Sequence, residues 1–178
     1  MMPTNTIIRP LHEQDIETVA AIHTECFPRQ KLSNLWISSN FKAFPRIQLF
    51  IAEASGRPVG YIQWTVKCGF RPEAIIELEQ LAVSPAMQNH GIGSALIEQS
   101  LAKVQTNLMP LGLSIKHILV STRADNYAQK IYAKTLGAQP VAVIPGLFST
   151  EEVLMVAYNV TTNPTMPTKN SSITPHKI

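Results

Sequence analysis

Hydrophobic and polar positions follow two different rhythms along the chain. Apolar runs rich in β-branched residues predict strands at 5–9, 47–54, 59–67, 75–83, 115–122, 139–144 and 152–159. Apolar residues that recur every three or four positions predict helices at 13–27, 32–44, 91–108 and 125–136. Helices set between strands in this order are typical of an α/β or α+β fold, with a mixed sheet of about seven strands and about four flanking helices.

The composition changes near residue 160. Residues 161–178 contain three of the thirteen prolines, two lysines and no acidic residue, together with many Ser, Thr and Asn. Such a segment cannot bury enough apolar surface to offset the entropy that is lost on ordering. We therefore expect a single domain over residues 1–160 and a disordered tail over residues 161–178.

The charge is small, and most of it belongs to the predicted tail. The formal net charge is +3, from 15 Lys and Arg against 12 Asp and Glu, and the tail lysines supply two of these units. The chain has no block of like charges and no apolar stretch long enough to cross a membrane. We therefore expect neither a nucleic acid nor a membrane as partner. We expect the protein to be a monomer or a homodimer. The N-terminus lacks a signal-peptide pattern, which favours a cytoplasmic protein.

The two cysteines, Cys26 and Cys68, do not have the spacing of a zinc site and are too few for a disulfide framework. The histidines show no metal-ligand spacing either. The sequence thus predicts two buried thiols and no metal.

The segment that follows the strand at 75–83 carries the clearest chemistry. It joins a strand to a helix through a turn with two glycines, which leaves backbone N–H groups unpaired at the positive end of the helix dipole. Such a loop binds phosphate. A Walker loop would need a lysine before Ser94, and a dinucleotide fingerprint would need a third glycine in place of Leu96. A third kind of phosphate site fits better.

The run Gln88-Asn89-His90-Gly91-Ile92-Gly93, preceded by Leu81-Ala82-Val83-Ser84-Pro85, resembles the signature of the GNAT superfamily of acetyl-CoA-dependent N-acetyltransferases. The resemblance covers about residues 5–160 and implies a mostly antiparallel sheet with acetyl-CoA as co-substrate. It implies that the amides from Gln88 to Ser94 hold the pyrophosphate of coenzyme A. The main chain of Leu81, Ala82 and Val83 would pair with the pantetheine arm, beside a β-bulge that frees these groups.

A second piece of the resemblance lies at residues 123–138. In the family an Asn at a helix start contacts the coenzyme, and a later Tyr protonates the departing thiolate. Asn126 and Tyr132 match these roles, but they are six residues apart where seven is usual, so either Asp125 takes the Asn position or the helix start is shifted. Tyr132 also falls on the apolar face of its helix, where the alternative is a core tyrosine with a hydrogen-bonded hydroxyl.

Two acidic residues are candidates for the base. Glu77 and Glu79 are two positions apart on one predicted strand and therefore project to the same face, as Leu81 would. Since only a deprotonated amine attacks a thioester, a carboxylate acting through water could remove the proton. The alternatives are that the pair binds a cationic substrate or is a solvated strand face.

The resulting hypothesis is an N-acetyltransferase that moves an acetyl group from acetyl-CoA directly to a primary amine of a small molecule. Glu77 or Glu79 would be the base and Tyr132 the acid. Two alternatives stay open: an enzyme that acetylates a protein or peptide amine, and a module that binds acyl-CoA without catalysis.

Overall fold

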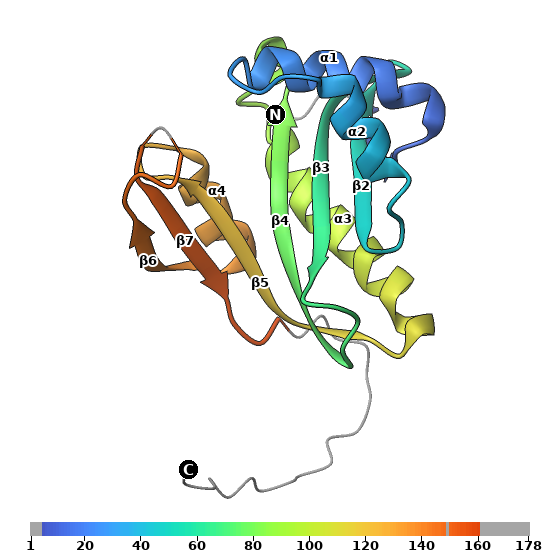
Figure 1. Ribbon diagram of the computed structural model, residues 1–178. Helices are drawn as coiled ribbons and strands as arrows, with labels where there is room; N and C mark the ends of the chain where they lie inside the picture. The colour runs from blue at the N-terminus through green and yellow to red at the C-terminus, as the bar shows by residue number, and fades with distance from the viewer. Residues whose placement is uncertain (1–4, 149, 161–178) are drawn as a thin grey trace, which may run out of the picture.

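The computed structural model describes residues 5–148 and 150–160 (Figure 1). The predicted tail at residues 161–178 lies outside the described residues. None of the helices in the described ranges has the length and apolarity that a membrane span requires.

Seven strands form one mixed sheet in the order β1-β2-β3-β4-β5-β7-β6. The strands are β1 (Ile7–Pro10), β2 (Ile47–Ala54), β3 (Arg57–Lys67), β4 (Glu73–Val83), β5 (Ser114–Arg123), β6 (Gln139–Ile144) and β7 (Glu152–Ala157). Only the β4–β5 pair is parallel, and every other pair is antiparallel. The predicted mixed, mostly antiparallel sheet is confirmed.

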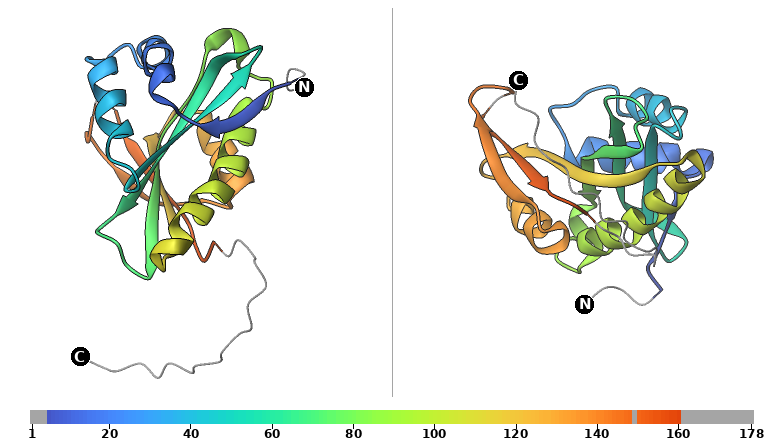
Figure 2. Two further views of the ribbon diagram at one scale, coloured as in Figure 1. Left: turned by 90° about the vertical axis from the view of Figure 1, so that its right-hand side faces the viewer. Right: turned by 90° about the horizontal axis from the view of Figure 1, so that it is seen from below.

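Four α-helices flank the sheet in the described part of the chain. They are α1 (Ile16–Cys26), α2 (Ser33–Phe41), α3 (Ile92–Leu108) and α4 (Ala128–Leu136), as the sequence pattern predicted in number and order. The helix α1 and its neighbour α2 cover one face of β2–β4, whereas α3 crosses the opposite face and α4 lies beside β5 (Figures 1 and 2). The predicted start of α4 at residue 125 was wrong, because residues before Ala128 form a turn.

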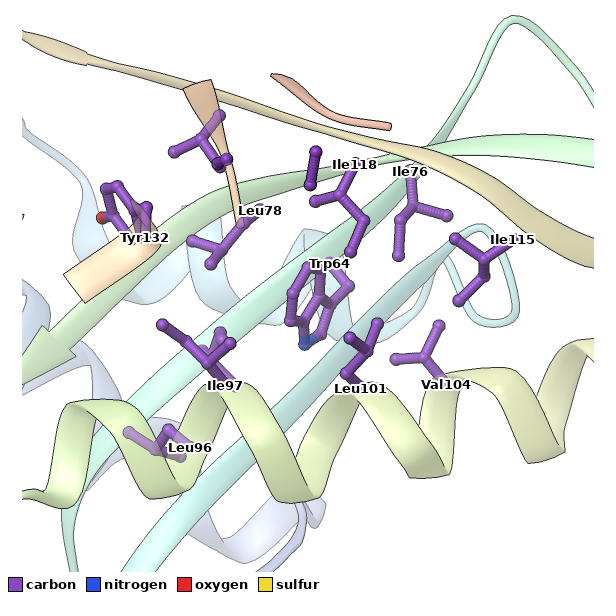
Figure 3. Packing of buried hydrophobic residues seen from close by; sticks show 14 of the residues in the cluster. Trp64, Ile76, Leu78, Leu96, Ile97, Leu101, Val104, Ile115, Ile118 and Tyr132 are labelled. Atoms are coloured by element: carbon purple, nitrogen blue, oxygen red, sulfur yellow. The ribbon is translucent and has the colours of Figure 1, made fainter. Parts of the chain in front are cut away.

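The two faces of the sheet carry separate apolar clusters. The larger packs α3 and α4 against β3–β5, with Trp64 fully enclosed between Leu78, Ile97 and Leu101 in the middle of the layer (Figure 3). The smaller packs α1 and α2 against β2 and β3 around Tyr61. Burial of these faces is the main source of stability, because each fully buried aliphatic side chain contributes about 1.5–3 kcal/mol.

A β-bulge interrupts β4. Gln63 of β3 pairs with Gln80, and the next residue, Trp64, pairs with Leu78, so Glu79 is left without a partner in β3. The extra residue reverses the facing of the strand beyond it. Leu81 therefore packs on the α3 side, whereas Ala82 packs on the α1 side. The expectation that Leu81 shares a face with the two glutamates was wrong for this reason.

The parallel pair separates beyond the middle of the sheet. The last paired position joins Glu77 to Leu119, while β4 continues to Val83 and β5 to Arg123. The two strands diverge visibly from this point (Figure 1). The terminal half of β4 therefore has an edge that β5 does not occupy.

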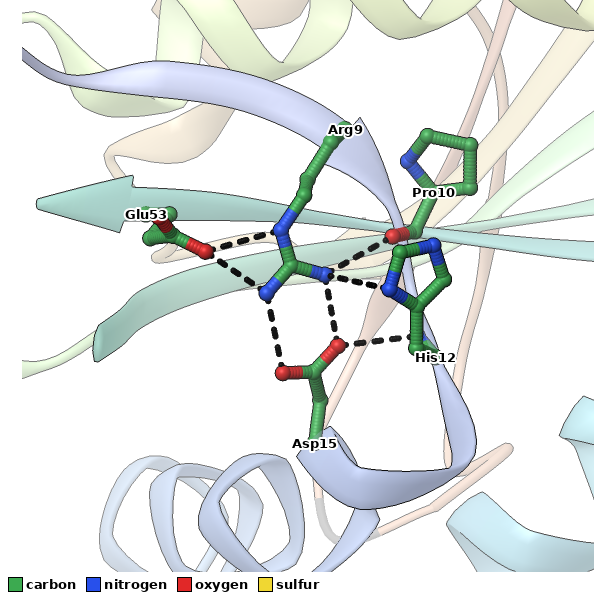
Figure 4. A network of polar contacts seen from close by, with 5 residues as sticks. All are labelled: Arg9, Pro10, His12, Asp15 and Glu53. Carbon is green, nitrogen blue, oxygen red and sulfur yellow. Dashed lines mark hydrogen bonds and ion pairs between the residues drawn. The ribbon is translucent and has the colours of Figure 1, made fainter. Parts of the chain in front are cut away.

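An ion-pair network fixes the start of α1 over the sheet. Arg9 of β1 donates from both terminal nitrogens to Asp15, at 2.6 and 3.0 Å, and from Nε to Glu53 of β2 at 2.8 Å (Figure 4). The backbone N–H of His12 also donates to Asp15. These bonds to Arg9 hold the pKa of Asp15 below its usual range.

The cysteines differ from expectation. Cys68 is exposed and Cys26 is half-buried, so the prediction of two buried thiols was wrong. Cys68 lies just past the end of β3 with a φ of 59°, in a connection that faces solvent.

Candidate active site

A cleft of about 300 Å³ opens where β4 and β5 diverge. Its walls are Leu81 and Val83 of β4, residues 87–89 and 91–94 of the following loop and helix, and Asn126, Tyr127, Ala128 and Ile131 at the start of α4. Most of the residues that the sequence predicted for coenzyme binding therefore gather in one place. Ala82 and His90 do not line it: Ala82 turns to the opposite face, and the exposed His90 lies outside the wall.

The N-terminus of α3 supplies unpaired donors to this cleft. Gly91 precedes the helix with a φ of 81°, a left-handed conformation that other residues adopt at a cost. The first helical bond to the Gly91 carbonyl comes from Ala95 N–H, so the amides of Ile92, Gly93 and Ser94 lack intrahelical acceptors. No described side chain caps this end. The helix start therefore offers three donors and a partial positive charge to an anion.

The loop before α3 is held by its own side chains. Gln88 Nε2 donates to the carbonyl of Val83 at 2.9 Å, which ties the loop back to the end of β4. Asn89 has a φ of 62°, and His90 Nδ1 lies 2.7 Å from the carbonyl of Gln88. The Gln88 side chain therefore shapes the loop, and the free donors in it come from the backbone.

Asn126 closes the other wall. Its side-chain oxygen accepts from the N–H of Ala128 at 2.9 Å, and its nitrogen donates to Thr122 Oγ1 at the same distance. This local bond explains why α4 starts two residues after Asn126. Asp125 pairs with Arg123 at the surface and is not part of the wall. The shorter Asn–Tyr interval thus accompanies a shifted helix start, and Asn126 is the residue at the cleft.

Tyr132 lies one turn further along α4, below the cleft wall. Its ring is buried in the larger apolar cluster, which packs α3 and α4 on the sheet (Figure 3). Burial raises the pKa of its phenol to about 12. The hydroxyl makes no hydrogen bond with a described residue, and its oxygen is not among the fully enclosed polar atoms that lack a partner in the described ranges. Tyr132 is therefore a hydrogen-bond donor that has no acceptor among the described residues.

The two glutamates lie on the α1 side of β4 and differ in their partners. Glu77 forms an ion pair with Lys67 Nζ at 2.8 Å, and this bond raises the pKa of Lys67. Glu79, the bulged residue, accepts a hydrogen bond from the hydroxyl of Thr65. Glu79 forms no ion pair with a described residue. The glutamate that makes no direct ion pair with a described residue is thus at the bulge, although the charge of Lys67 acts on both carboxylates.

A polar network that sequence reasoning missed lies next to Glu79. Gln80 Oε1 accepts from the Tyr61 hydroxyl at 2.7 Å and from the Trp36 indole at 3.4 Å, while its amide donates to Gln30 at 3.2 Å. His23 Nε2 also donates to Gln30 Oε1 at 2.9 Å. The sequence offered one signal of this network, which is the presence of polar residues inside apolar strands. That signal does not show which residues those side chains contact.

His23 is neutral in this network. Because the Gln30 oxygen can only accept, His23 carries its proton on Nε2, and Nδ1 accepts from the Ser33 hydroxyl at 2.9 Å. Burial lowers the pKa of the imidazole. Within the described residues, no group of three or more His, Cys, Asp or Glu is placed to hold a metal ion.

The model of the acetyltransferase (GNAT) family matches residues 16–138. No curated protein matches the sequence. Solved structures are similar in fold. Ard1 from Thermoplasma volcanium has 19% identity and a TM-score of 0.71 over 88% of this chain and 99% of that chain. An aminoglycoside 6'-N-acetyltransferase complexed with coenzyme A has 14% identity and a TM-score of 0.70 over 89% and 99%.

A third similar structure is the ribosomal-protein-S18-alanine N-acetyltransferase from Escherichia coli, with 20% identity and a TM-score of 0.65 over 92% of this chain and 99% of that chain. Identities this low show the shared fold alone. The family match is independent of them and spans more than half of the 178 residues. This chain therefore belongs to the acetyltransferase (GNAT) family.

Proposed function

We propose that the protein transfers the acetyl group of acetyl-CoA directly to the primary amine of a small molecule. The observation that carries this proposal is the cleft, which combines the open N-terminus of α3 with the unoccupied edge of β4. The first suits a pyrophosphate and the second an extended arm with amide groups. The residues present therefore fit coenzyme A.

On the binding side, the amides of Ile92, Gly93 and Ser94 would hold the pyrophosphate. Gly93 lines this part of the cleft without a side chain, and a Cβ there would make only an ordinary contact with Leu81 Cδ2, at 3.8 Å. The main chain of Leu81 and Val83 would align the pantetheine arm, with Asn126 at the opposite wall. The thioester would then lie near the bulge, where a strand N–H can polarise its carbonyl.

On the acceptor side, Glu79 would take the proton from the ammonium, directly or through a water. Its carboxylate makes no direct ion pair with a described residue, whereas Glu77 pairs with Lys67 at 2.8 Å. This difference favours Glu79 as the base and gives Glu77 a role in the local charge balance. Once deprotonated, the amine attacks the carbonyl carbon and the C–S bond breaks.

Tyr132 would stabilise the departing sulfur. With a pKa near 12, the phenol stays protonated at neutral pH, and none of the described residues accepts a hydrogen bond from it. It can donate a hydrogen bond to the thiolate as charge develops and pass on the proton as an acid. No covalent enzyme intermediate is required.

A screen for release of free thiol tests this function. Purified protein with acetyl-CoA is offered putrescine, 2-phenylethylamine, kanamycin and a peptide with a free N-terminus, and the product mass is recorded. We expect thiol release and a mass increase of one acetyl group with a small amine. Activity on the peptide alone would replace the small-molecule acceptor by a protein amine. Acetyl-CoA binding without thiol release for any amine would indicate a non-catalytic module.

A further inference from the structure

The α1 side of the sheet carries an apolar surface directly beside the proposed base. Trp36 of α2 is 40% exposed, and Leu32 and Leu35 on the same side of the helix start are more exposed still. Leu35 and Trp36 belong to the first turn of α2, and Leu32 precedes the helix in a left-handed conformation with a φ of 57°. Exposed apolar groups that gather next to a site are typical of ligand surfaces.

Gln80 determines where the Trp36 indole lies. Its oxygen accepts from both the Tyr61 hydroxyl and the Trp36 Nε1–H, and Tyr61 is itself fully buried. Gln80 follows Glu79 in the chain and is 9% exposed, so it is a fixed link between α2 and the bulge. The indole is thereby held over the part of β4 that carries the proposed base.

Charge on this face matches one cation. Lys67 pairs directly with Glu77 and also acts on Glu79, so the two glutamates and Lys67 together carry one net negative charge. A polyamine would bring its second ammonium against the apolar surface of Leu35 and Trp36, where it would lose hydration. A monoamine with an apolar body satisfies both the carboxylate and the indole.

Resting on the proposed function, we propose that Gln80 is a positioning residue that holds Trp36 as the apolar wall of the acceptor site. The site therefore takes primary monoamines with an aromatic or aliphatic body in preference to polyamines.

The test compares 2-phenylethylamine with putrescine in the full-length protein. We expect kcat/KM to be at least about tenfold higher for 2-phenylethylamine, and this preference to fall to about twofold or less in Trp36→Ala. Gln80→Leu should raise KM for 2-phenylethylamine about tenfold while kcat and the Kd of acetyl-CoA change less than about threefold.

Gln48→Leu is the matched control. Gln48 is a buried glutamine of β2 whose side chain bonds the Pro45 carbonyl and Asn107. It takes no part in the hydrogen bonds that join Gln80 to Trp36. We expect Gln48→Leu to lower stability without changing either KM. In the ¹H–¹⁵N spectrum, Gln80→Leu should shift the Trp36 indole signal, and Gln48→Leu should leave that signal in place. A shift caused by Gln48→Leu should fall on Trp64, which lies opposite Gln48 in the sheet and bonds Ser100.

Equal kcat/KM for the two amines, no turnover of either, or an unmoved indole signal in Gln80→Leu would each overturn the proposal. A KM increase of the same size in Gln48→Leu would do so as well. The proposed function fails separately, by the absence of acetyl-CoA binding in calorimetry on the wild-type protein.

Discussion

The two sides of β4 differ in what they offer a ligand. On the α3 side, the groups that face the cleft are main-chain donors: the amides at the start of α3 and the unoccupied edge of β4. On the α1 side, the polar groups are side chains joined in a network around Gln80. Backbone groups depend on the path of the chain, whereas the network depends on the identity of each side chain.

The bulge at Glu79 separates these two sides. It turns Leu81 toward the cleft while Glu79 and Gln80 face α1 and α2. One extra residue therefore makes a single strand present different side chains to the two sides, which under the proposed function would be the coenzyme side and the acceptor side. Substitutions on the α3 side should change coenzyme affinity, and those on the α1 side should change catalysis and acceptor choice.

The largest effect is expected from Gly93→Asp. A carboxylate in the first turn of α3 suits the helix dipole but occupies the proposed pyrophosphate position, so stability should be retained while acetyl-CoA affinity falls by about a thousandfold. Calorimetric titration and thermal unfolding measure the two quantities. Gly93→Ala is the control, since its Cβ makes only ordinary contacts and adds no charge. Unchanged affinity in the Asp variant would place the pyrophosphate elsewhere.

Glu79→Gln should act on turnover and on the KM of the amine, and not on the coenzyme. Removal of a general base costs about a hundredfold or more in kcat, and the Kd of acetyl-CoA should stay the same because the residue faces the other side of β4. Glu77→Gln is the comparison variant and should lower kcat by less than about tenfold, since Glu77 is already paired with Lys67. The reverse order of the two effects would assign the base to Glu77.

Tyr132→Phe should lower kcat by about a hundredfold, at the low end of acid catalysis. Its stability should hardly change at neutral pH, because the hydroxyl has no hydrogen-bond partner among the described residues. Tyr61→Phe is the opposite case: it breaks the bond to Gln80 and should cost about 1 kcal/mol of unfolding free energy. Equal turnover in wild type and Tyr132→Phe would remove the acid role and leave a core tyrosine.

The pH dependence of Tyr132 follows from the same burial. Its pKa rises from 10.0 to about 12 in the folded protein, so its contribution to stability is complete below pH 10 and is lost as the pH rises toward 12. Urea unfolding of wild type and Tyr132→Phe between pH 9 and about pH 12 should show a smaller loss for the variant. Parallel curves would mean that the phenol titrates at its ordinary pKa.

The smallest effect on activity is expected at Asp15, which supports the α1 side from outside the site. Asp15→Asn should lower the unfolding free energy by about 2 kcal/mol at neutral pH and change kcat by less than about twofold. Since Arg9 lowers the pKa of Asp15, this contribution is present above pH 4 and disappears as the pH falls through the lowered value. The unfolding free energies of wild type and Asp15→Asn, measured against pH, should become equal in acid. A difference that persists at acidic pH would contradict this account.

Local pattern was enough for most of the fold. β2 and β6 have the bounds that their apolar runs predicted, and α3 differs by one residue at its start. The phosphate loop was predictable because a strand, a glycine turn and a helix must leave unpaired amides wherever they occur. The start of α4 was not, because the bond from Ala128 N–H to Asn126 competes with the helix in a way that periodicity does not register.

The acceptor side was less predictable for a physical reason. The facing of Leu81 depends on where the bulge falls, and a shift of one residue reverses every later side chain. The network of Gln80 joins residues that are 19 to 50 positions apart, such as Tyr61 and Gln30. Such contacts depend on how α1 and α2 pack on the sheet, which no local sequence window contains.

The most direct test of the division between the two sides is a titration of ¹⁵N-labelled protein with acetyl-CoA, followed by amide chemical shifts. We expect the largest shifts at residues 88–94, Leu81 and Val83, with the amides of α2 little changed. Subsequent addition of 2-phenylethylamine with coenzyme A in place of acetyl-CoA should move the Trp36 indole signal and the amides around Glu79. Acetyl-CoA shifts centred on α2, or none at residues 92–94, would contradict the account.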